Sequence, residues 1–234
     1  MKYGKWIGGG LGWVLGGPIG AIVGFALMSY LEGGKETGSA GTQSGDFTVS
    51  LLVLSAAVVR ADGKVDAREM NFVREFLMRQ TGGRGIDQKM ATLEKLVQKQ
   101  FDVDPVCAQI SQNMDSASKL QLLHLLFGIS NSDGQVHVSE VNVILNISSK
   151  LGIPQSDFES IKAMFYKDAD ASFKILEVDS KVSNDEVKKA YRAMAKKFHP
   201  DKVTHLGEEY QNSAKEKFQK VQEAYENIKK ERAI

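Results

Sequence analysis

Phe198-His199-Pro200-Asp201-Lys202 lies near the end of the chain, between two segments with apolar residues at helical spacing. The first segment covers residues 186–197 and the second covers residues 213–230. Their apolar residues are Val187, Tyr191, Met194 and Phe198, then Phe218, Val221, Ala224, Tyr225 and Ile228. The pattern predicts two amphipathic helices that form an antiparallel hairpin, with the His-Pro-Asp tip in water.

Residues 176–228 resemble a J-domain, the co-chaperone module that stimulates DnaK-class heat-shock ATPases. The resemblance rests on Leu-Glu-Val at 176–178, the run 183–192, the His-Pro-Asp-Lys tip and the run 218–226. Pro200 alone could be a helix stop, but that does not explain the flanking segments. The resemblance implies a short first helix at 173–176 and a contact with the chaperone ATPase. The residues implied are His199, Pro200 and Asp201 for stimulation, and Tyr191, Arg192, Lys196 and Lys197 for docking.

The basic face of the first hairpin segment could also be an ordinary solvated surface or a phosphate-binding surface. Lys188, Lys189 and Arg192 belong to this face. The formal net charge is only +1, and no exposed aromatics are interleaved for base stacking, so we expect no nucleic-acid partner. Electrostatic steering toward an acidic chaperone surface fits better. The sequence has no P-loop, nucleophile elbow or paired catalytic carboxylates, so we expect no enzyme activity.

Composition restricts the remaining classes. The chain has 234 residues and a single cysteine, Cys107, which rules out an internal disulfide and a cysteine-rich zinc site. No Gly/Phe-rich region follows the J-domain-like part, so we do not expect a general client-binding chaperone.

The N-terminal segment, residues 1–32, has no charged residue between Ile7 and Leu31. As a helix that run would reach about 37 Å, enough to cross a bilayer core. Its glycines recur at every fourth residue, which predicts helix self-association in lipid and a homo-oligomer. These glycines are Gly8, Gly12, Gly16, Gly20 and Gly24. We predict membrane association, at the inner (cytoplasmic) membrane with the J-domain on the cytoplasmic side.

Three alternatives to a spanning helix stay open. They are a cleaved signal peptide, a helical hairpin that turns at residues 16–18 without crossing, and a peripheral glycine-rich oligomerisation segment. Residues 33–45 are rich in glycine and small polar residues, which predicts a flexible linker.

Residues 46–167 show helical periodicity and little strand signal, so we predict an all-α protein. The segment resembles a TerB-type helical domain, and the J-domain follows at 170–234. A membrane segment, a TerB-like domain and a C-terminal J-domain, in that order, resemble the DjlA class of J-proteins. The predicted helices of the middle domain are residues 47–60, 67–80, 87–100, 105–113, 116–130, 138–150 and 155–166.

The middle domain contains an internal repeat, because residues 61–69 and 132–140 share the pattern D-G-x-V-x-x-x-E between two helices. The spacing equals the second half of an EF-hand loop, but the opening ligand position falls on Val58 in one copy and Ile129 in the other. If the copies pack about a pseudo-two-fold axis, their carboxylates could bind Ca²⁺ or another hard divalent cation. The candidate ligands are Asp62, Glu69, Asp133 and Glu140. We favour the structural interpretation, turns followed by helix caps, with no certain cofactor.

The sequence therefore predicts a membrane-associated co-chaperone that stimulates a DnaK-class ATPase, with the TerB-like domain recognising a partner or ligand. The alternatives are a metal- or tellurite-stress protein whose TerB-like domain binds a divalent cation, and a structural scaffold with an inert J-like part.

Overall fold

The computed structural model describes residues 44–166 and 170–233, and within these ranges every regular element is a helix. This confirms the predicted all-α class. The elements are α2 (Ser44–Val59), α3 (Ala67–Thr81), α4 (Ile86–Val97), α5 (Asp104–Asn113), α6 (Ser116–Ser130), α7 (Val138–Lys150), α8 (Gln155–Ala163), α9 (Ala171–Ile175), α10 (Asn184–Lys197), η1 (Pro200–Leu206) and α11 (Glu208–Arg232).

The predicted membrane segment, its glycine repeat and most of the predicted linker lie outside the described residues. The last two linker residues, Ser44 and Gly45, already belong to α2. Within the described part of the chain, no helix combines the length and apolar character needed to span a bilayer.

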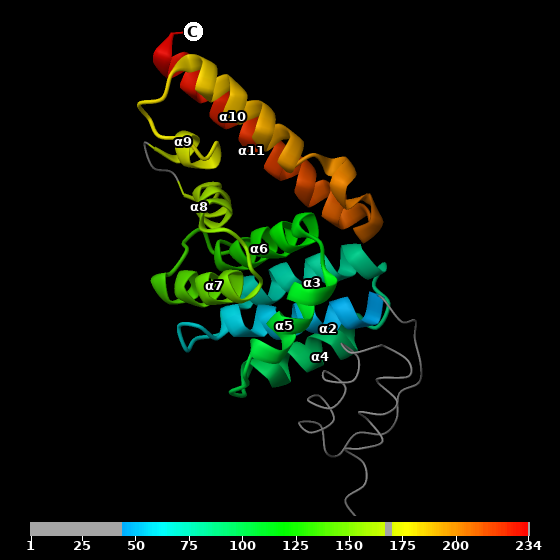
Figure 1. Cartoon of the computed structure of the whole chain (residues 1–234). Helices are drawn as coiled ribbons and strands as arrows, with labels where there is room; N and C mark the ends of the chain where they lie inside the picture. The colour runs from blue at the N-terminus through cyan, green and yellow to red at the C-terminus, as the bar shows by residue number, and fades with distance from the viewer. Residues whose placement is uncertain (1–43, 167–169, 234) are drawn as a thin grey trace, which may run out of the picture.

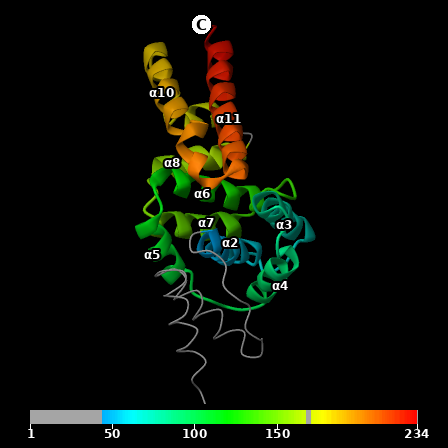
Figure 2. The same ribbon diagram turned by 90° about the vertical axis from the view of Figure 1, so that its right-hand side faces the viewer.

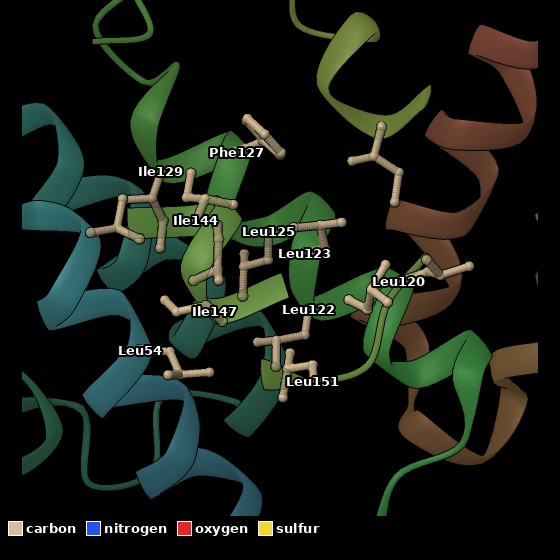
Figure 3. Packing of buried hydrophobic residues seen from close by; sticks show 14 of the residues in the cluster. Leu54, Leu120, Leu122, Leu123, Leu125, Phe127, Ile129, Ile144, Ile147 and Leu151 are labelled. Atoms are coloured by element: carbon tan, nitrogen blue, oxygen red, sulfur yellow. The ribbon is translucent and has the colours of Figure 1, made fainter. Parts of the chain in front are cut away.

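Helices α2 to α8 form a bundle around α2 and α6 (Figure 1). The side chains of α6 are buried around almost its whole circumference, which is why its apolar residues run continuously from Leu122 to Phe127, with only His124 between them. Figure 3 shows Leu54, Leu122, Ile144 and Ile147 meeting in the centre of this bundle. Because several helices contribute to this core, we expect that truncation of one side chain in its centre lowers the free energy of unfolding.

The observed helix boundaries agree closely with the predicted ones where the capping residue is adjacent to the helix in sequence. Helices α6 and α7 have the predicted limits, and Asp115 and His137 occupy their N-cap positions. Helix α5 begins at Asp104, one residue before the predicted start, and the side chain of Asp102 accepts from the Asp104 amide. Helix α8 ends at Ala163 and not at residue 166.

Helices α10 and α11 form the predicted antiparallel hairpin, which we call the C-terminal hairpin (Figure 2). The Ser183–Glu186 capping box at the start of α10 is present. Helix α11 begins at Glu208, earlier than the predicted residue 213, because η1 takes up most of the connection. The side chains of His199 and Asp201 at the tip are exposed, as predicted, and the tip end of the hairpin also lies against α6 of the bundle.

Replacing Leu54 by alanine should lower the free energy of unfolding by about 2–5 kcal/mol, because Leu54 is fully buried in α2 and a cavity would remain. Leu145→Ala is the matched control, since Leu145 is 36% exposed on α7 and should cost less than about 1 kcal/mol. Chemical denaturation of both variants measures the difference. Equal losses would mean that α2 is not the centre of the core.

Candidate functional site

The His-Pro-Asp tip follows directly from the end of α10. Phe198 is the C-cap residue of α10, and Pro200 is the first residue of η1, where its missing amide proton costs nothing. The backbone amide of Asp201 donates to Nδ1 of His199 over 3.3 Å, so the neutral ring carries its proton on Nε2. The side chains of His199 and Asp201 are 49% and 84% exposed. The tip therefore presents hydrogen-bonding groups on a turn whose backbone is fixed.

The tip is supported from behind by aromatic side chains. The imidazole of His199 meets the ring of Phe218 edge-on at 5.8 Å between centroids. Tyr191, predicted to belong to the docking surface, is only half exposed and stacks on Tyr225 at 4.4 Å. Offset stacking of this kind joins α10 to α11. Tyr191 therefore also has a structural role in the hairpin.

The basic face of α10 is exposed as predicted. Lys188, Lys189, Arg192 and Lys196 are all exposed, and none makes a salt bridge to another residue in the described part of the chain. Such a group of like charges raises the rate of encounter with an acidic surface.

Lys197 is different, because its charge is already neutralised. Its Nζ contacts the carboxylate of Asp157 on α8, and it donates to Glu177 over 2.7 Å. We call Lys197, Asp157 and Glu177 the Lys197 cluster. Burial opposes the charge of Lys197, but the two carboxylates outweigh it and raise its pKa. One predicted docking residue is thus bound to the bundle.

Farther along the hairpin, α11 buries a second lysine against α6. Lys217 has no exposed surface, and its Nζ donates to Oε1 of Gln121 and to the carbonyl and hydroxyl oxygens of Ser213. Burial holds the pKa of Lys217 well below its ordinary value. His124 of α6 is buried nearby, and its Nδ1 lies 3.3 Å from the Ser213 hydroxyl.

Three further contacts join the hairpin to the bundle. The buried ring of Tyr210 meets Phe76 of α3 edge-on at 5.4 Å. Nearby, Arg79 donates to Glu209 over 2.8 Å. On the other side of the tip, His205 of η1 lies 3.2 Å from the carboxylate of Asp115. The hairpin is therefore attached to the bundle by apolar, polar and charged contacts together.

Sequence reasoning missed Asp157, Glu177, Gln121 and Lys217. One signal for Lys217 was available: it takes a position in the apolar stripe formed by Ala214, Val221, Ala224 and Ile228, where a charged residue is unexpected. Asp157 and Glu177 gave no local signal, because their partner is remote in sequence.

The two copies of the internal repeat form the same turn. The amide of Lys64 donates to Asp62 and the amide of Gln135 donates to Asp133, both over 2.8 Å. The glycine after each aspartate has a positive φ, 80° at Gly63 and 87° at Gly134, which favours glycine there. This confirms the turn interpretation of the repeat.

The glutamates of the repeat do meet across the bundle. Glu69 and Glu140 are 5% and 4% exposed, and their side chains are hydrogen-bonded to each other. Ser130 and the His137 amide both donate to Glu140. Burial first, and then the neighbouring carboxylate, raise the pKa of Glu69 to about 9.

The four carboxylates proposed as metal ligands are only partly brought together. Asp66 caps α3, and Arg68 pairs with both Asp66 and Asp133. Among the residues that the structure describes, no group of three or more His, Cys, Asp or Glu side chains is arranged to hold a metal ion. The two glutamates of the repeat meet, and cation binding by its four carboxylates stays a prediction.

Comparison with known proteins matches both halves of the chain. Residues 48–163 match the family described as Tellurite resistance protein TerB, and residues 171–233 match the DnaJ domain. The Co-chaperone protein DjlA of Coxiella burnetii is 24% identical over 99% of this chain and 98% of its own length. That of Vibrio cholerae is 28% identical over 81% of this chain and 79% of its own.

The Chaperone protein DnaJ of Lactococcus lactis is 52% identical, but over only 24% of this chain and 13% of its own length. No solved structure matches the chain. The chain is a J-domain protein that carries a TerB domain before its J-domain. Within that class it is DjlA-like over nearly its whole length, as the sequence predicted.

The Glu69–Glu140 pair predicts a pH-dependent stability. Between pH 4.5, the ordinary pKa of glutamate, and about 9, the folded protein keeps a proton on Glu69 that the unfolded chain loses. The free energy of unfolding should therefore fall as the pH rises through this window. In Glu69→Gln this decrease should be smaller than in wild type by about 1–3 kcal/mol.

Denaturation at pH 5 and pH 9 measures this slope. Glu75→Gln is the control, because Glu75 lies on the same helix with a side chain that is 69% exposed. An unchanged slope in Glu69→Gln would show that Glu69 is ionised in the folded protein.

Proposed function

We propose that the protein is a J-domain co-chaperone that stimulates ATP hydrolysis by a DnaK-class chaperone. The observation that carries the proposal is the exposed His-Pro-Asp tip beside the basic face of α10. The DjlA and DnaJ relatives are named as co-chaperones or chaperones, which supports the same activity.

The geometry suggests a division of labour between the tip and the basic face. Lys188, Lys189, Arg192 and Lys196 attract an acidic surface and orient the hairpin on it. His199 and Asp201 then contact the chaperone from a stiff turn, where little conformational entropy is left to lose. The ATP and its hydrolytic site belong to the chaperone, so the protein itself is not an enzyme in this proposal.

We also propose that residues 1–32 attach the protein to the cytoplasmic side of the inner membrane and that their glycine repeat supports self-association. The charge-free run of Ile7 to Leu31 and the period of its glycines support this. Attachment would confine the J-domain to chaperones near the membrane, while the TerB domain recognises a partner or ligand.

The full chain should raise the steady-state ATPase rate of a DnaK-class chaperone, and His199→Gln should abolish most of that rise. A loss of about tenfold or more is expected, because the glutamine cannot reproduce the imidazole at the tip. Thr204→Ala, another exposed residue of η1, is the control. Equal stimulation by wild type and His199→Gln would contradict the proposal.

The full chain should float with vesicles of phosphatidylethanolamine and phosphatidylglycerol, whereas a chain that lacks residues 1–32 should remain in the soluble fraction. The shortened chain keeps every residue that the structure describes, so its loss of flotation would reflect the segment itself. If both chains float, the membrane contact lies outside residues 1–32. If neither chain floats, residues 1–32 are not a membrane anchor.

A further inference from the structure

The tip end of the J-domain is covered on one side by the TerB domain. Ala117, Leu120 and Gln121 of α6 face Phe198, His199 and Lys202 across a narrow crevice. Phe198 and Val203 are buried, although both flank the exposed tip. Figure 3 shows Leu120 on the side of α6 next to the hairpin, away from the centre of the bundle. A chaperone that surrounds the tip would meet α6 on this side.

The Lys197 cluster occupies a residue of the predicted docking surface. Asp157, which belongs to the TerB domain, is 6% exposed, and its carboxylate neutralises the lysine that directly precedes Phe198 and His199. An acidic chaperone surface would have to displace this carboxylate before it could use Lys197. The TerB domain thus presents to Lys197 a negative charge of the kind that the acidic surface of the proposed chaperone partner would present.

The backbone of Glu177 supports a specific role for the cluster. Glu177 has φ 56°, the left-handed conformation that glycine adopts readily and other residues adopt at a cost. At this position the side chain of Glu177 reaches Lys197, 2.7 Å away, and completes its ion pairing. The strain is therefore compensated by a contact that fixes Lys197 beside Asp157.

Further contacts, made by other residues, hold the same arrangement. Arg79 of the TerB domain pairs with Glu209 at the start of α11, where the side chain of Glu209 is only 13% exposed. Tyr210 and Lys217 bury themselves against α3 and α6 along the same face of α11. Opening would have to separate these groups together, so the contact behaves as one cooperative interface.

From these contacts we propose that the TerB domain inhibits the J-domain in cis. In the closed state Asp157 and α6 mask the docking end of the J-domain, and the Lys197 cluster and the Arg79–Glu209 pair hold it closed. The partner that opens it is the chaperone, which competes for Lys197. The inference rests on the proposed function and adds a regulation of the same site.

Asp157→Asn in the full chain tests the masking, because it removes the charge and keeps the shape of the side chain. At a sub-saturating concentration it should stimulate the chaperone ATPase about threefold or more above wild type. Glu177→Gly should act in the same direction, and the glycine suits the backbone there. Glu159→Gln, on the same helix and paired only with neighbours on α8, should match wild type.

A charge swap at the Arg79–Glu209 pair, which does not involve Lys197, separates opening from any direct effect on docking. Arg79→Glu and Glu209→Arg should each raise stimulation, and the double variant should return it toward the wild-type level. Hydrogen exchange without chaperone provides a second readout. Amides of 117–121 and 198–206 should exchange faster in Asp157→Asn and in each single swap variant than in wild type.

The outcomes distinguish the two proposals. If wild type stimulates the chaperone and none of these variants stimulates it more, the masking proposal is wrong and the co-chaperone activity stands. The same conclusion holds if none of the variants accelerates hydrogen exchange. Absence of stimulation by every chain, variants included, would overturn the proposed function and the masking with it. Stimulation by the variants alone would support both.

Discussion

Lys217 places a primary amine, wholly buried, where α11 of the J-domain meets α6 of the TerB domain. A buried amine is tolerated only with hydrogen-bond partners, and here Gln121 and Ser213 provide them. An apolar stripe could slide along α6, but a lysine that needs these oxygens fixes one register. The position of the whole hairpin on the bundle depends on this interaction.

With that register set, the remaining contacts follow from the lengths of the helices. Tyr210 reaches Phe76, and at the other end of η1 Lys197 meets Asp157. The tip then lies beside the start of α6, with one side exposed and one side covered (Figure 2). The TerB domain is therefore more than a neighbour in sequence, because it determines which side of the J-domain a partner can approach.

The sequence predicted features that depend on nearby residues. The limits of α6 and α7 and the His-Pro-Asp turn follow from caps, prolines and apolar spacing within a few positions. Contacts across the fold were out of reach: Asp157 carries no local sign that its partner is Lys197. The repeat lies between these cases, because its turns were predicted, but the burial of Glu69 against Glu140, which raises the pKa of Glu69, was not.

Docking of the J-domain on the TerB domain is most directly tested by a distance measurement in solution. Spin labels at Leu145→Cys on α7 and Lys189→Cys on α10, in a full chain with Cys107→Ala, would report on the two domains, since both positions are exposed and Cys107 is buried. Docking predicts a single narrow distance distribution that agrees with the structure. A broad distribution, as for two domains that move independently of each other, would contradict it.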